Sequence, residues 1–193
     1  MGLLGVQAIA AHTIAFEISI VVLLVAWAVA NAVATRIGTI SVQEGCAGVW
    51  RVLNSSLLIF FLFMLPPMVV LKLFSPWAVM LFVGAGLKAQ TLLPTAAPVV
   101  VLAAFFVFVN GLRLVLNHAL NGLADMKVPA LIAAVSYWGI ALPVGITLGF
   151  MLELGVLGMW WGLITGMSVA TVAYFMRFWW LVRHSSLATK SDQ

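Results

Sequence analysis

The stretch Asn110–Pro143 reads NGLRLVLNHALNGLADMKVPALIAAVSYWGIALP, two apolar segments joined by a short polar hinge. If the first segment is an α-helix, four of its polar residues fall within about 80° of one another on the helix surface. These four, which we call the polar stripe, are Asn110, Arg113, Asn117 and Asn121. An arginine inside a nearly uncharged apolar helix is a functional candidate, because ionisable groups are costly in lipid.

The composition predicts an integral membrane protein. Apolar residues make up 65% of the 193 residues and charged residues 7%, and the mean hydropathy is +1.21, which excludes an ordinary soluble domain. The net charge of +4 comes from nine basic and five acidic residues without a basic cluster, so we predict no nucleic-acid partner. The single cysteine, Cys46, and the absence of metal-ligand spacing predict no metal site and no cofactor.

Charge-free windows long enough to cross the hydrocarbon core predict an all-α fold with about five transmembrane helices. The predicted spans lie near 8–36, 48–74, 91–121, 128–151 and 154–181. We expect a single domain over 1–185 and a tail over 186–193.

Basic residues predict the orientation in the membrane. One side of the predicted bundle carries six of them, Arg36, Arg51, Lys127, Arg177, Arg183 and Lys190, and the other carries Lys72 and Lys88. By the positive-inside rule the first side, with the C-terminus and the tail, is cytoplasmic. Five spans then put the N-terminus outside, which suggests a missing upstream segment.

The first predicted span contains Glu17 on a helix face with Thr13, Asn31 and Thr35. Two readings of Glu17 stay open: a hydrated carboxylate near the outer interface, or a protonatable carboxylate that lines a cavity. His12 is expected to be structural.

Small residues in the last two spans predict close helix packing. Gly145 and Gly149 are four residues apart, as are Gly158, Gly162 and Gly166, and this spacing lets helix backbones approach each other. Pro143 is expected to bend its helix. Five aromatic residues are interpreted as interfacial anchors: Trp160, Trp161, Phe178, Trp179 and Trp180.

Several motifs occur in a characteristic order. They are LGVQAIAAHTIAFEIS (4–19), ANAVATRIG (30–38), ALNGLADMKVP (119–129), SYWGIALPVGITLGF (136–150) and LGVLGMWWGLITG (154–166). In order and spacing the chain resembles the C-terminal lobe of multidrug and toxic-compound extrusion (MATE) transporters. The resemblance implies that the five spans correspond to helices eight to twelve of a twelve-helix antiporter with cytoplasmic termini.

The chain departs from the family pattern at the polar stripe. Cation-coupled relatives commonly carry Asp-x-x-Gln where this chain has Asn110 and Arg113, and the hinge arginine of the family is Asn121. Asn110 offers an oxygen but cannot titrate, and Arg113 repels a nearby cation. Glu17 stands where the family usually has an uncharged amide, so one hypothesis is an ion pair between Arg113 and Glu17.

The leading functional hypothesis is a partial multidrug efflux antiporter of MATE type in the inner (plasma) membrane. It would export cationic or amphiphilic compounds by alternating access, coupled to a proton or sodium gradient, when completed by the missing N-terminal lobe or a second subunit. The candidate pathway residues are Glu17, Asn110, Arg113 and Asn117. The alternative is a small non-transporting membrane protein whose polar stripe packs against partner helices. An enzyme is not expected, because no catalytic motif is present.

Overall fold

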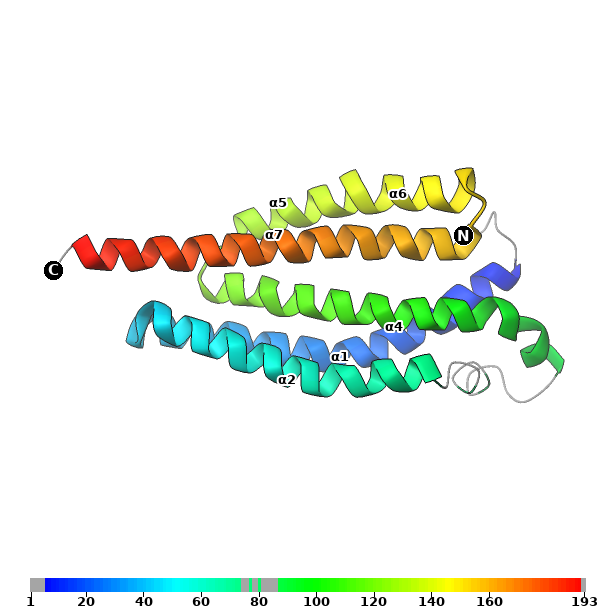
Figure 1. Cartoon of the computed structure of the whole chain (residues 1–193), viewed down its shortest axis with the longest axis horizontal. Helices are drawn as coiled ribbons and strands as arrows, with labels where there is room; N and C mark the ends of the chain where they lie inside the picture. Colours follow the sequence, from blue (N-terminus) through cyan, green and yellow to red (C-terminus); the bar gives the residue numbers. More distant parts are fainter. Residues whose placement is uncertain (1–5, 74–76, 78–79, 81–86, 192–193) are drawn as a thin grey trace.

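The computed structural model describes residues 6–73, 77, 80 and 87–191, and the described chain is a bundle of long helices (Figure 1). In chain order the elements are α1 (Val6–Gln43), α2 (Gly45–Leu73), α4 (Leu87–Gly122), α5 (Lys127–Ala134), η2 (Val135–Ala141), α6 (Leu142–Ile146), η3 (Thr147–Met151) and α7 (Gly155–Ser191). The four elements from α5 to η3 follow one another without a break and form one long helical rod.

Five helical segments of the described chain are long and apolar enough to cross a membrane: His12–Gln43, Gly45–Val70, Pro98–Gly122, Lys127–Met151 and Gly155–His184. Each overlaps one predicted span, so the predicted fold class is confirmed. The first segment runs further than predicted, because the helix continues until the turn at Gly45, where φ is +61°.

The helices run alternately up and down. The α1–α2 turn, the α4–α5 hinge and the C-terminal part of α7 lie toward one end of the bundle, and the α6–α7 connection lies at the other (Figure 1). At the first end, the Cys46 thiol lies 3.2 Å from the Val182 carbonyl oxygen, and Arg177 Nε donates to Asp125 Oδ2 at 2.7 Å. The hinge and α7 are therefore joined by an ion pair that is largely shielded from solvent.

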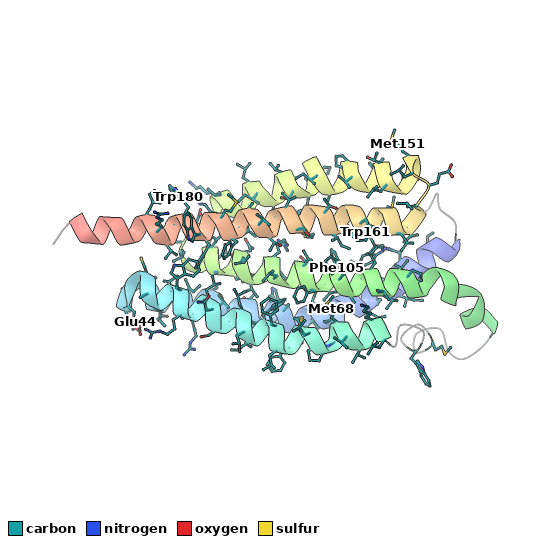
Figure 2. All side chains as sticks on the ribbon, viewed as in Figure 1. Glu44, Met68, Phe105, Met151, Trp161 and Trp180 are labelled. Atoms are coloured by element: carbon teal, nitrogen blue, oxygen red, sulfur yellow. The ribbon has the colours of Figure 1, made fainter. Side chains whose placement is uncertain are left out.

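Two apolar clusters form the interior. The larger joins α1, α2, α4 and α7 through buried residues that include Ile37, Leu53, Phe60, Leu120 and Phe178. The smaller joins α1, α4 and α7 around Ala15, Val100 and Trp160. Many other large apolar side chains, such as Phe105 and Trp161, both labelled in Figure 2, are exposed, as expected for helices in contact with lipid.

The glycines pack α6 and the neighbouring π-helical turns against α7, as predicted. A Cβ built on Gly162 would collide with the Cα and N atoms of Gly145, and one on Gly158 would lie 2.5 Å from the Leu148 carbonyl carbon. One on Gly166 would lie 2.5 Å from Ala141 Cβ. The two backbones therefore touch along these glycines, and a larger side chain would have to separate them.

Pro143 lies between two π-helical stretches, η2 and η3. Pro143 has no N–H to donate, and the preceding Leu142 N–H bonds to the Tyr137 carbonyl, five residues back. The Thr147 hydroxyl donates to the Pro143 carbonyl. The helix thus accommodates the proline by widening its turns.

The structure corrects the prediction that five aromatic residues of α7 are interfacial anchors. Trp160 and Phe178 are fully buried, whereas Trp161 is 46% exposed. Trp160 packs edge-on against Phe106, with ring centroids 5.3 Å apart, and against His12 at 5.7 Å. Trp160 and Phe178 are core residues because they face α4 and its neighbours, so their place near a span end does not bring them to the surface.

Candidate functional site

The arginine of the polar stripe, Arg113, points from α4 into the bundle. Arg113 is half-buried, and its Nε donates a hydrogen bond of 2.9 Å to Oδ1 of Asn110, one helical turn earlier. Asn110 is buried, with 9% of its surface exposed. The spacing of three residues places the two side chains on the same helix face, as the sequence predicts.

Aromatic residues from two other elements complete the surroundings of Arg113. The guanidinium interacts electrostatically with the buried Tyr174 side chain of α7, and its central carbon lies 5.8 Å from the centroid of the Tyr137 ring of η2. The Tyr174 hydroxyl donates in turn to the Pro129 carbonyl of α5 at 3.0 Å. We call Asn110, Arg113, Tyr137 and Tyr174 the arginine network; it ties α4, the α5–η2 rod and α7 together.

The arginine network does not include Glu17, which corrects the hypothesis of an Arg113–Glu17 ion pair. Within the described ranges the ion pairs are Arg51–Glu44 and Arg177–Asp125, and Glu17 lies on an exposed face of α1. Arg113 instead interacts with the Asn110 amide on its own helix and with the tyrosines that η2 and α7 present to α4.

The face of α1 that carries Glu17 satisfies its other polar groups locally. The exposed Thr13 hydroxyl donates to the Ile9 carbonyl at 2.9 Å, Asn31 donates to Trp27 at 2.9 Å, and Thr35 donates to Asn31 at 3.1 Å. This face points away from the core of the lobe. Glu17 is therefore a candidate for contact with lipid headgroups, water or another protein surface, rather than for a site with Arg113.

The rest of the polar stripe lies nearer the hinge. Asn117 and Asn121 are half-buried on the same helix, and neither belongs to the arginine network. Of the four predicted pathway residues, the structure thus brings together Asn110 and Arg113, places Asn117 one turn beyond Arg113, and separates Glu17 from all three.

The two tyrosines of the arginine network were not predicted from the sequence as site residues. The chain has only these two tyrosines, Tyr137 and Tyr174, and both lie in spans. A phenolic hydroxyl inside a membrane needs a hydrogen-bond partner. Two tyrosines in an otherwise apolar set of spans could therefore have been predicted to take part in polar contacts inside the bundle. The partner itself was not predictable, because Arg113 and Tyr174 lie on different helices.

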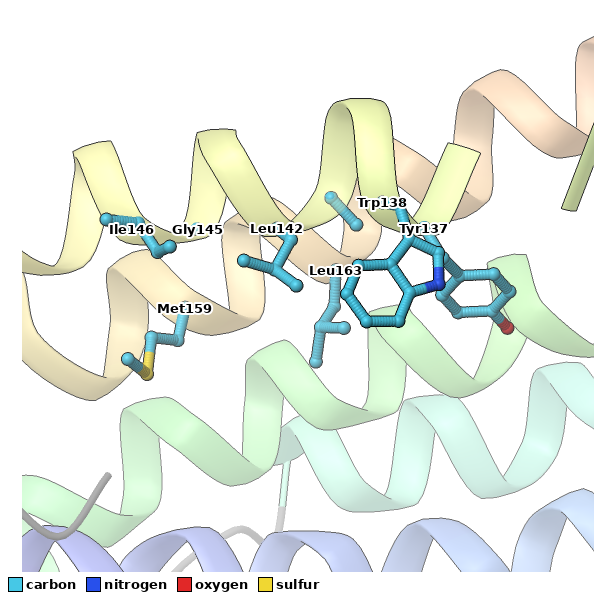
Figure 3. Close-up of a pocket in the computed structure, with 8 residues that line it drawn as sticks. Tyr137, Trp138, Leu142, Gly145, Ile146, Met159 and Leu163 are labelled. Atoms are coloured by element: carbon cyan, nitrogen blue, oxygen red, sulfur yellow. The ribbon is translucent and has the colours of Figure 1, made fainter. Parts of the chain in front are cut away.

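A pocket of about 550 Å³ opens beside the arginine network, between the η2–α6 rod and α7 (Figure 3). Its walls are almost entirely apolar. The lining residues are Tyr137, Trp138, Ala141, Leu142, Gly145, Ile146, Met159 and Leu163. Tyr137 belongs to both features: it lines the pocket, and its ring centroid lies 5.8 Å from the guanidinium carbon of Arg113.

A helical membrane lobe with a charged hydrogen-bond network inside and an apolar pocket beside it is typical of a transporter. A family model described as MatE matches residues 1–147, and the chain belongs to this family. The family consists of transporters rather than enzymes, which confirms both the resemblance and the expectation that the chain is not an enzyme.

Curated proteins that are similar to this chain support the same assignment. The chain is 32% identical over 186 residues to a probable multidrug resistance protein NorM of Xylella fastidiosa (strain 9a5c), covering 92% of this chain and 37% of the relative. It is 32% identical over 191 residues to the multidrug resistance protein NorM of Burkholderia vietnamiensis, covering 92% and 39%. The chain thus spans about two fifths of the length of these relatives.

Solved structures share the fold. One is an inward-facing multidrug resistance MATE family transporter, with a TM-score of 0.81 at 16% identity over 93% of this chain and 42% of that chain. Another is the eukaryotic MATE transporter AtDTX14, with a TM-score of 0.74 at 13% identity over 93% and 40%. The five helices described above are therefore arranged as in part of a MATE transporter.

Proposed function

We propose that this chain forms most of one lobe of a multidrug exporter in the inner membrane. The lobe, completed by an opposing lobe, would move cationic or amphiphilic organic compounds outward by alternating access. The observation that carries this proposal is the match of nearly the whole chain to about two fifths of proteins named multidrug resistance protein NorM. A transporter of this type works by rocking one repeat against another around a central site, so one lobe requires a second.

In this proposal the arginine network keeps the lobe rigid while it moves. Arg113 and Tyr174 link α4 to α7, and the Tyr174–Pro129 bond links α7 to α5. The backbone contact between Gly145 and Gly162 joins the rest of the rod to α7. These three helical elements would therefore rotate as one body, while the exposed faces of the lobe change partners.

The coupling ion in this proposal is a proton or sodium, and Asn110 is a poor ligand for either. Its Oδ1 already accepts from Arg113, and a positive charge at this distance opposes a second cation. The titratable candidate in the lobe is then Glu17, which is exposed on α1. We therefore assign ion coupling to Glu17 or to the opposing lobe.

Dye efflux tests the proposal. A host without its own efflux pumps would carry this chain alone, or the chain fused in frame behind the N-terminal half of the Xylella fastidiosa relative. We expect the fusion to lower dye retention, an uncoupler to abolish that effect, and the chain alone to have none. A Gly162→Leu fusion, in which the α6–α7 contact cannot form, is the matched inactive control.

Two outcomes would contradict the proposal. Gradient-driven export by the chain alone would show that no opposing lobe is needed. Failure of the fusion to export dye, while the intact relative exports it in the same host and the fusion is present in the membrane, would favour the non-transporting alternative.

The proposed orientation places the hinge and the C-terminus in the cytoplasm. In a Cys46→Ser background, a cysteine at Glu153 should react with an impermeant thiol reagent in intact cells, and a cysteine at Met126 should react only after the cells are opened. Both residues are exposed. Met126 lies in the α4–α5 hinge and Glu153 in the connection to α7, and these two connections are at opposite ends of the bundle (Figure 1), so the two labels are comparable. The reverse pattern would invert the proposed topology.

A further inference from the structure

We propose that the pocket between the η2–α6 rod and α7 binds the apolar tail of a single-chain amphiphile, whose carboxylate is bound by Arg113. This inference rests on the proposed efflux function and narrows its substrate class from cationic or amphiphilic compounds to amphiphilic carboxylates.

The pocket suits an apolar tail. Its volume of about 550 Å³ falls within the range of pockets that hold small organic molecules. Leu142 and Ile146 from α6 face Met159 and Leu163 from α7 across it (Figure 3). Gly145, which lines the pocket, approaches the backbone of Gly162 and so holds the rod against α7. The pocket therefore has a defined shape as well as an apolar surface.

The cation at the Tyr137 end has unused donor capacity. A guanidinium has five N–H donors, and the protein groups described around Arg113 are the Asn110 oxygen and the Tyr174 hydroxyl. Within the described residues no carboxylate forms an ion pair with Arg113. A half-buried positive charge therefore remains without an opposite charge beside it.

A carboxylate is the ligand group that this arrangement favours. Arginine binds carboxylates through two parallel hydrogen bonds, and these charge-assisted bonds are stronger than neutral ones. An ammonium head at the same place would meet a like charge in surroundings of low polarity, where repulsion is stronger than in water. The Tyr137 ring, which contacts both the pocket and the guanidinium, would separate the tail region from the head region.

Binding of three ligands with the same twelve-carbon tail tests the inference directly. Dodecanoate, dodecylammonium and dodecanol would be titrated into the protein in nanodiscs of zwitterionic lipid, with empty nanodiscs as the reference, at a pH where both charged heads are ionised. We expect dodecanoate to bind at least about tenfold more tightly than either other ligand, as one charge-assisted interaction implies.

Variants locate the site. Arg113→Gln should remove the preference for dodecanoate and Arg113→Lys should retain part of it, while Arg51→Gln, at an exposed arginine of α2, should leave it unchanged. Leu163→Trp should weaken all three ligands by filling the pocket. A brominated dodecanoate should quench the fluorescence of the pocket residue Trp138, and Trp138→Phe should remove that part of the quenching.

The inference is overturned if the unmodified protein binds dodecanoate and dodecylammonium equally, or prefers the ammonium. It is also overturned if phosphatidylglycerol in the nanodisc displaces dodecanoate completely, because the occupant is then a membrane lipid. Neither result affects the proposed function, which is tested separately by dye efflux, so the two failures are distinguishable.

Discussion

The contact between Gly162 and Gly145 supports a quantitative prediction. Gly162→Ala adds one methyl group, which would overlap backbone Cα and N atoms of Gly145 and lie 2.7 Å from the Ala141 carbonyl oxygen. Backbone atoms cannot turn aside as a flexible side chain can, so the rod and α7 must separate along their whole contact. Overpacking of this kind costs about 1–3 kcal/mol, and we expect the upper part of that range.

The matched control is Gly139→Ala in η2, on the rod against which Gly162 of α7 packs. A methyl at Gly139 meets only Val135 Cγ1, at an ordinary distance of 3.8 Å. Both variants gain about 1 kcal/mol from the higher helix propensity of alanine, so this gain cancels when they are compared. Gly162→Ala should therefore be less stable than Gly139→Ala by about 2–3 kcal/mol, from the overpacking cost alone.

Reversible unfolding in mixed detergent micelles, followed by circular dichroism, measures this difference. The two variants should also differ in the same direction in thermal midpoint. If their free energies of unfolding agree within about 0.5 kcal/mol, the usual effect of an unconstrained substitution, then the helices are not in backbone contact at Gly162 and the described packing is wrong.

Two further predictions concern buried side chains, and both use unfolding in the same micelles. Asp125→Asn should lower the free energy of unfolding by about 1–3 kcal/mol, because it leaves the guanidinium of Arg177 poorly paired in a largely shielded place. Glu44→Gln, in an exposed ion pair, should lower it by less than about 1 kcal/mol. Equal effects of the two variants would contradict the burial of the hinge ion pair. Trp160→Ala should lower the free energy of unfolding by about 3–5 kcal/mol, and Trp161→Ala should lower it much less, because of these two residues only Trp160 is enclosed. A larger effect of Trp161→Ala would restore the interpretation of Trp160 as an interfacial anchor.

The span pattern was predictable from the sequence because the bilayer sets a minimum length of apolar helix. Each predicted span overlaps a helix of the described chain. Close packing through Gly145 and Gly162 was predictable for a related reason: small residues at helical spacing are the means by which membrane helices approach each other. Both inferences need only periodicity and composition.

The orientation of individual side chains on α7 was not predictable in the same way. Trp160 stands five residues after the start of the helix at Gly155, which resembles the position of an interfacial anchor. Whether such a residue faces lipid or protein depends on which neighbours surround the helix, and here Phe106 and His12 enclose it. The position of a residue along the membrane normal therefore does not show whether it faces lipid or protein.

In the candidate site, too, the local contact was predictable and the contact between helices was not. The bond between Arg113 and Asn110 is local, and a spacing of three residues predicts it. The partner on another helix was sought among carboxylates, which led to Glu17. The structure places Tyr174 and the Tyr137 ring beside Arg113 instead, because a half-buried guanidinium also interacts with neutral oxygens and with an aromatic face.

The central claim is that Arg113 belongs to a network with Tyr174 and not to an ion pair with Glu17. Two double-mutant cycles, read by unfolding in micelles, test it: Arg113→Met with Tyr174→Phe, and Arg113→Met with Glu17→Gln. We expect a coupling energy of about 0.5–1.5 kcal/mol in the first cycle, as for polar interactions between membrane helices, and none in the second. Coupling to Glu17 together with no coupling to Tyr174 would contradict the claim.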